Sequence, residues 1–282
     1  MTLQAAKQLP KVQDFTFAFN CLGEDVPMEV RFAAAKAAGF NEVGLSLRWT
    51  LLWLEQGHDL AELDRLIADS GLQVTELEAV RVMSAEPDPR IEFAAQMAER
   101  YRPHRLQSVG PFEGTVDDAA QRVGLVADRF ATWGVEVVLE PLPFTNMQTP
   151  ADAAEIIKRA DRPNISICMD VWHLYRMNLP LSHLDGLWPF ISTVQFNDGT
   201  VVCEYPDDLR EDCLRNRRVP GAGEFDLVGL LRARNANRPD SWFSLEVIAT
   251  ELRDQDPYLT AQQIADGLTE VLAEVERQET AS

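Results

Sequence analysis

Short runs of β-branched and aromatic residues alternate with longer segments of helical pattern along nearly all of the 282 residues. Parallel strands need helical crossovers, and eight strand–helix units close into a barrel. The sequence therefore predicts an α/β fold, a single (β/α)8 TIM barrel. An open, doubly wound sheet gives a similar pattern, but no Gly-x-Gly-x-x-Gly follows the first strand. The expected strands are residues 15–19, 42–47, 72–77, 105–109, 135–140, 165–170, 193–196 and 242–247.

The helical segments have recognisable ends. Gly39 and Gly71 each follow one, and Thr149 with Pro150 has the form of an N-cap followed by the first helical residue. The expected helices are residues 27–38, 60–70, 91–101, 115–133, a segment from 149 onward, and 261–276. No Ser/Gly-rich linker or fixed-period repeat divides the chain. Residues 1–282 are therefore predicted to be one barrel domain with short polar tails at both ends.

The charge balance limits the partners. Subtracting 45 acidic from 26 basic residues gives a net charge of −19. Such a surface repels nucleic acid and anionic membranes. The first residues carry no apolar signal region, and the four cysteines form no Cys-x-x-Cys. We therefore expect a cytoplasmic protein with reduced thiols and with no nucleic-acid or membrane partner.

Polar residues close four successive expected strands at the end where barrel enzymes carry their active site. They are Glu140, Asp170, Gln195 and Glu246. Three carboxylates packed together need a cation, and oxygen donors suit Mn²⁺, with Mg²⁺ or Co²⁺ as alternatives. The sequence thus predicts one divalent metal ion per chain at these residues. Each acid taken alone also fits a helix cap or an arginine partner.

Further candidates flank these acids. His173 follows Asp170 by three residues and is expected to polarise substrate or relay a proton. Arg218 begins a glycine-containing segment, 218–226, where the backbone can approach a ligand, and it suits a substrate oxygen or carboxylate. Arg48 stands near a strand end and is a candidate for substrate contact, as is Glu78. Trp172 fits a pocket wall or the core equally well.

Five segments together resemble the xylose isomerase-like TIM-barrel superfamily of sugar isomerases and epimerases. Its members include hydroxypyruvate isomerase, ketose 3-epimerases, and inosose and 3-dehydroshikimate dehydratases. The resemblance extends over about residues 15–275, and the segments are VLEPL at 138–142, MDVWH at 169–173, VQFND at 194–198, RVPGAG at 218–223 and LEV at 245–247. In this family Glu, Asp, His and Glu hold one divalent ion, which implies Glu140, Asp170, Gln195 and Glu246 here. Gln195 replaces the commoner His, as it does in some relatives that resemble hydroxypyruvate isomerase and 3-dehydroshikimate dehydratase.

The resemblance implies a metal-dependent isomerase or epimerase that acts on a ketose or keto acid through an enediolate. Glu140 and Glu246 would then be the acid–base pair, while His173 and Arg218 would steady the developing oxyanion. A dehydratase of a keto-cyclitol or 3-dehydroshikimate-like acid begins with the same step and is the alternative. A non-catalytic sugar-binding barrel is an alternative of another class.

The sequence also limits the kind of partner that we expect. A DNA-repair endonuclease related by fold is disfavoured by the four histidines and the acidic charge. The expected partner is a small-molecule sugar or keto acid, and a homodimer or a homotetramer fits the chain.

Overall fold

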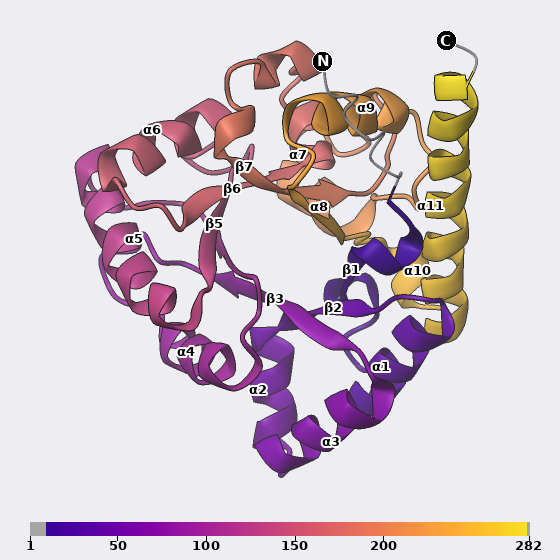
Figure 1. The fold of residues 1–282 in the computed structure, drawn as a ribbon, viewed down its shortest axis with the longest axis horizontal. Coiled ribbons are helices and arrows are strands. Elements are labelled where there is room, and N and C mark those ends of the chain that lie inside the picture. The colour runs from indigo at the N-terminus through magenta and orange to yellow at the C-terminus, as the bar shows by residue number, and fades with distance from the viewer. Residues whose placement is uncertain (1–9, 281–282) are drawn as a thin grey trace, which may run out of the picture.

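The fold is a closed barrel of eight parallel strands in chain order, with β8 pairing back onto β1 (Figure 1). The computed structural model describes residues 10–280. The predicted (β/α)8 TIM barrel is confirmed, whereas the outermost residues of the expected tails, 1–9 and 281–282, lie outside the described residues. The strands are β1 Phe15–Ala18, β2 Glu42–Ser46, β3 Gln73–Val80, β4 Arg105–Val109, β5 Glu136–Glu140, β6 Ile165–Asp170, β7 Ile191–Phe196 and β8 Trp242–Leu245.

Helices surround the barrel, and the long α11 packs against α1 and α9, which closes the ring (Figure 1). Among residues 10–280 no helix has the length and apolar character that crossing a bilayer requires. The helices are α1 Met28–Ala37, α2 Leu47–Glu55, α3 Leu60–Ser70, α4 Arg90–Tyr101, α5 Val116–Phe130, α6 Pro150–Ala160, α7 Val171–Arg176, α8 Leu209–Arg215, α9 Leu227–Asn237, α10 Thr250–Arg253 and α11 Pro257–Thr280.

Local sequence sets several helix ends as expected. Thr149 caps α6 in a reciprocal capping box with Asp152, and Gly71 ends α3 in the left-handed conformation. No helix was expected between the strand at 42–47 and the helix at 60–70, but the structure has helix α2 there. Ser46 is both the last residue of β2 and the N-cap of α2, so no turn residues separate the two elements.

The barrel interior is polar near its middle. The Nε of Arg105 lies 2.5 Å from Glu76 Oε2, and both side chains are fully buried. Glu76 Oε1 accepts a hydrogen bond from the Ser244 hydroxyl at 3.0 Å. These residues belong to β3, β4 and β8, so the contacts cross the inside of the barrel. Gly44 on β2 provides the room, because a Cβ there would overlap the Glu76 carboxylate.

The opposite end of the barrel from the strand carboxyl termini is closed by a ring stack. His104 precedes β4 and Trp242 begins β8, and their ring centroids lie 3.8 Å apart. Burial lowers the pKa of His104 to about 4, and neighbouring Arg105 adds to this effect.

Candidate active site at the carboxyl end of the barrel

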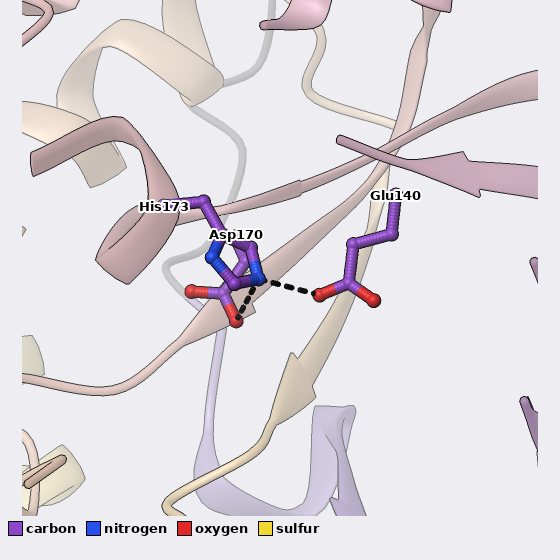
Figure 2. A group of neighbouring side chains, drawn as sticks. All are labelled: Glu140, Asp170 and His173. Carbon is purple, nitrogen blue, oxygen red and sulfur yellow. Dashed lines mark hydrogen bonds and ion pairs between the residues drawn. The ribbon is translucent and has the colours of Figure 1, made fainter. Parts of the chain in front are cut away.

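Glu140, Asp170 and His173 form one buried cluster (Figure 2). His173 Nε2 lies 3.0 Å from Glu140 Oε1 and 3.9 Å from Asp170 Oδ2. Asp170 ends β6 and its Oδ1 accepts the Trp172 N–H at 2.7 Å, so helix α7 starts at once. This cap places His173, in the first turn of α7, back over the strand ends. The three candidate ligand atoms all lie within 4.8 Å of one another.

Gln195 joins this cluster through a second amide. Its Cα pairs with that of Asp170 across β6 and β7. Gln195 Nε2 donates to Gln107 Oε1 at 3.3 Å, and Gln107 Nε2 donates to Glu140 Oε2 at 2.6 Å. Gln195 Oε1 is buried and has no hydrogen-bond partner, so it is an acceptor that a ligand can use.

Glu246 directly follows β8, and its ion-pair partner is an arginine. Arg217 Nη1 lies 2.9 Å from Glu246 Oε2 and 2.8 Å from Asp170 Oδ2. Burial alone lowers the pKa of Arg217, yet these carboxylates outweigh it and hold that pKa above its ordinary value. Burial raises the pKa of Glu246, while Arg217 opposes the shift. The guanidinium therefore neutralises part of the acidic cluster.

A further carboxyl approaches Glu246 through Asn20, which follows β1. Asn20 Nδ2 donates to Glu246 Oε1 at 3.2 Å and also to Glu78 Oε2. Glu78 is buried on β3. Burial raises the pKa of Glu78 well above its usual range, and nearby Glu76 and Glu246 add to this. Glu78 thus accepts a hydrogen bond from the same Asn20 amide that contacts Glu246. The raised pKa of Glu78 favours the neutral form of its carboxyl.

The loop that carries Arg217 is tied down by Asp198. The Asp198 carboxylate accepts four backbone N–H groups, from Gly199 at 2.8 Å, Gly221 at 2.9 Å, and Gly223 and Phe225 at 3.0 Å each. Asn197, one residue earlier, donates to Asp170 Oδ1 at 2.8 Å. The end of β7 therefore positions both Asp170 and the glycine-containing loop.

The predicted substrate contacts lie in different surroundings. Trp172 is fully buried, with its ring edge-to-face against His173 at 5.2 Å. The Arg218 side chain is 44% exposed and pairs with Glu204 at 3.4 Å. Arg48, near the start of α2, is 66% exposed and pairs with Glu24. The structure thus brings Trp172 to the cluster and leaves Arg218 and Arg48 outside it.

Three residues of this network were not among the predicted site residues: Asn20, Gln107 and Arg217. Asn20 follows a strand, and Gln107 alternates with Arg105 along β4, so the strand-end and alternation rules point to both. Arg217 offers no such signal, because nothing in the sequence tells which of two adjacent arginines points inward.

The donors fit a hard divalent ion. Glu140, Asp170 and His173 offer ligand atoms that lie within 4.8 Å of one another, and this group does not include Glu246, which is joined to Asp170 through Arg217. The unpartnered Oε1 of Gln195, on the strand beside Asp170, is a further oxygen donor. Buried carboxylates at this spacing repel one another unless a cation balances them. Arg217 supplies one positive charge, which leaves the cluster still acidic.

A closed barrel with acids and a histidine at its carboxyl rim defines a class of (β/α)8 proteins whose site faces that rim. The family model for the xylose isomerase-like TIM barrel matches residues 32–271, and the chain belongs to this family. The predicted family resemblance is thereby confirmed. None of the curated proteins compared with the chain matches it.

Solved structures of this fold include several enzymes. IolI, solved with a zinc atom, is 17% identical with a TM-score of 0.75, and the match covers 93% of this chain and 99% of IolI. The probable 3-DHS dehydratase AsbF of Bacillus anthracis is 18% identical with a TM-score of 0.73, over 91% of this chain and 98% of AsbF. D-psicose 3-epimerase of Clostridium cellulolyticum H10, solved with D-tagatose, is 14% identical with a TM-score of 0.70, over 93% and 99%.

One further match is to a protein that is longer than this chain. A fusion of a xylose isomerase-like TIM barrel with 4-hydroxyphenylpyruvate dioxygenase is 19% identical with a TM-score of 0.75. The match covers 96% of this chain, which spans 45% of the length of the fusion protein. At these identities the likeness shows the fold, and relatives with isomerase, epimerase and dehydratase names share it.

Proposed function

We propose that this chain is a divalent-metal-dependent isomerase or epimerase of a ketose or keto acid, working through an enediolate. The observation that carries the proposal is the placement of Glu140 and Glu246. They close β5 and follow β8, are both buried, and have different partners: His173 and Gln107 for Glu140, Arg217 and Asn20 for Glu246. Two carboxylates held separately around one centre are what a proton removal and a proton return require.

In this proposal Glu140, Asp170, Gln195 and Glu246 hold one Mn²⁺, with Mg²⁺ or Co²⁺ as alternatives. When bound, the ion supplies Lewis-acid chemistry, because it polarises a substrate carbonyl and acidifies the neighbouring C–H. One of Glu140 and Glu246 takes the proton on a carboxylate oxygen, and the other returns a proton to the same or the adjacent carbon. His173, whose Nε2 contacts Glu140, moves a proton or holds the developing oxyanion.

Residues around the proposed metal ligands have roles in this proposal too. Arg217 adds a buried positive charge beside Asp170 and Glu246, which favours an anionic intermediate. Trp172, Arg218 and Arg48 are the proposed substrate contacts, with Arg218 and Arg48 reaching substrate from the rim. The proposed substrate is a small molecule, and the proposed protein is a cytoplasmic homodimer or homotetramer.

Solvent exchange tests the proposal. Mn²⁺-loaded protein is incubated in D₂O with a panel of ketoses and keto acids, and deuterium at carbon is followed by mass spectrometry and NMR. Wild type should incorporate deuterium into at least one compound, and Glu246→Gln should lose this by about 10²-fold or more, the range of general acid–base catalysis. Glu99→Gln, an exposed acid in α4, is the matched control and should retain it.

Other outcomes select the alternatives. A product with new near-ultraviolet absorbance, from a conjugated double bond, assigns the dehydratase reaction instead. Compound binding without deuterium uptake in any form assigns a sugar-binding barrel. Retained exchange in Glu246→Gln contradicts the role given to Glu246.

A further inference from the structure

Arg217 holds the same carboxylates that the proposed function gives to the metal ion. Its Nη1 lies 2.8 Å from Asp170 Oδ2, 2.9 Å from Glu246 Oε2 and 2.7 Å from the Glu246 carbonyl oxygen. The Arg217 side chain is 1% exposed, so water screens none of these contacts. One buried guanidinium group is thus shared between two of the four proposed ligands.

This guanidinium is fixed from several sides. The Arg217 backbone N–H donates to Ile248 O at 3.2 Å, and Nη2 lies 3.3 Å from Cys213 Sγ. The following residue, Arg218, is bridged to Asp198 by main-chain hydrogen bonds in both directions. Arg217 is therefore a built part of the site, unlike a surface arginine that samples many rotamers.

Two cations at the same oxygens oppose each other. A carboxylate oxygen that accepts a short hydrogen bond from a guanidinium gives part of its charge to that partner. A divalent ion on the same carboxylate then lies close to a like charge, and in a buried site this repulsion is strong. We propose that Arg217 competes with the divalent ion for Asp170 and Glu246 and so lowers the metal affinity of the site.

Acidic residues also border Arg217 on its other side. Arg217 lines a cavity of about 820 Å³ between residues 215–222, α10 and α11. Glu251, Asp266 and Glu270 line the same cavity.

This inference rests on the metal site of the proposed function, and direct metal titration separates the two. Full-length protein is stripped with chelator, and Mn²⁺ binding is measured by isothermal titration calorimetry, without any substrate. Arg217→Gln should bind Mn²⁺ at least about tenfold more tightly than wild type, because a buried like charge has been removed. Arg217→Lys keeps the charge and should stay near wild type.

The matched control is Arg215→Gln. Arg215 lines the same cavity and carries the same charge, but its ion-pair partner is the half-buried Glu211 in place of Asp170 and Glu246. Its Mn²⁺ affinity should stay within about threefold of wild type. If stripped Arg217→Gln unfolds, the comparison is made on Mn²⁺-loaded proteins by competition with a chelator of known affinity.

Each remaining outcome overturns the inference. Equal or weaker Mn²⁺ binding by Arg217→Gln, with one ion bound by wild type, contradicts the competition and leaves the metal site standing. Equal tightening by Arg215→Gln shows a general charge effect and also contradicts it. No Mn²⁺ bound by any form contradicts both the inference and the proposed metal site.

Discussion

The main chains of Asp198 and Arg218 hold each other through two hydrogen bonds, N to O at 2.9 Å and 2.8 Å, although twenty residues separate them. The same aspartate accepts four further backbone N–H groups with its carboxylate. The end of β7 therefore fixes the loop that delivers Arg217 to Asp170 and Glu246.

Replacing this carboxylate should loosen the loop. In Asp198→Asn one oxygen becomes an NH₂ group that faces backbone donors, so the free energy of unfolding should fall by about 2–4 kcal/mol. Urea denaturation measures the change. Asp226→Asn is the control, because Asp226 caps α9 and asparagine caps equally well, so that change should stay within about 0.5 kcal/mol. Similar losses in both variants would contradict the anchoring role.

Neutralising Glu78 should stabilise the protein more as the pH rises. Because the pKa of Glu78 is raised in the folded state, the folded protein binds more protons than the unfolded chain above about pH 4.5. Ionisation of Glu78 therefore lowers the free energy of unfolding of the wild-type protein as the pH rises toward and through the pKa of Glu78 in the folded state. Glu78→Gln keeps the shape and removes the titration, so its melting temperature relative to wild type should increase from pH 5 to pH 8. A pH-independent difference in calorimetry contradicts this.

Acid should weaken the fold through His104. The folded pKa is about 4 and the unfolded value about 6.5, so the unfolded chain binds more protons between these values. The contribution is present at neutral pH and is lost as pH falls from about 6.5 toward 4. His104→Phe keeps a ring against Trp242, and its unfolding free energy should decline less than that of wild type between pH 7 and pH 5. Parallel declines would exclude His104 as a source.

Removing one partner of the buried Arg105–Glu76 pair should destabilise the protein, whereas replacing both partners should have a much smaller effect. Arg105→Met leaves Glu76 buried without its cation, which should reduce the free energy of unfolding by about 3–5 kcal/mol. Adding Glu76→Leu removes the unpaired charge and should restore most of the loss. A double-mutant cycle by chemical denaturation measures the coupling, and additive losses would show that the two residues act independently.

Much of the fold follows from local chemistry. The run at 135–140 is apolar and mostly β-branched apart from Glu136 and its final acid, as expected for a parallel strand covered on both faces, and β5 is Glu136–Glu140. Thr149 and Pro150 mark the start of α6 for reasons of capping and backbone angle. Helix α2 was not predicted from the sequence. Ser46 is both the last residue of β2 and the N-cap of α2, so no turn residue marks the boundary between the two elements.

The candidate site could be predicted only in part. Glu140 and Asp170 end their strands, so strand-end reasoning brings them together, and the three-residue spacing adds His173. Arg217 could not be distinguished from Arg218, because the choice depends on main-chain bonds to Asp198, far away in sequence. The Asn20 bridge to Glu246 likewise depends on barrel closure, which brings β1 beside β8.

Metal stoichiometry tests the central claim most directly. Protein stripped with chelator and reconstituted with Mn²⁺ is assayed by elemental analysis beside Asp170→Asn, which keeps one oxygen for the Trp172 cap. The account predicts one ion per wild-type chain and its loss, or an at least tenfold weaker affinity, in the variant. A folded wild-type protein that binds no divalent ion, or a variant that binds as tightly as wild type, would contradict it.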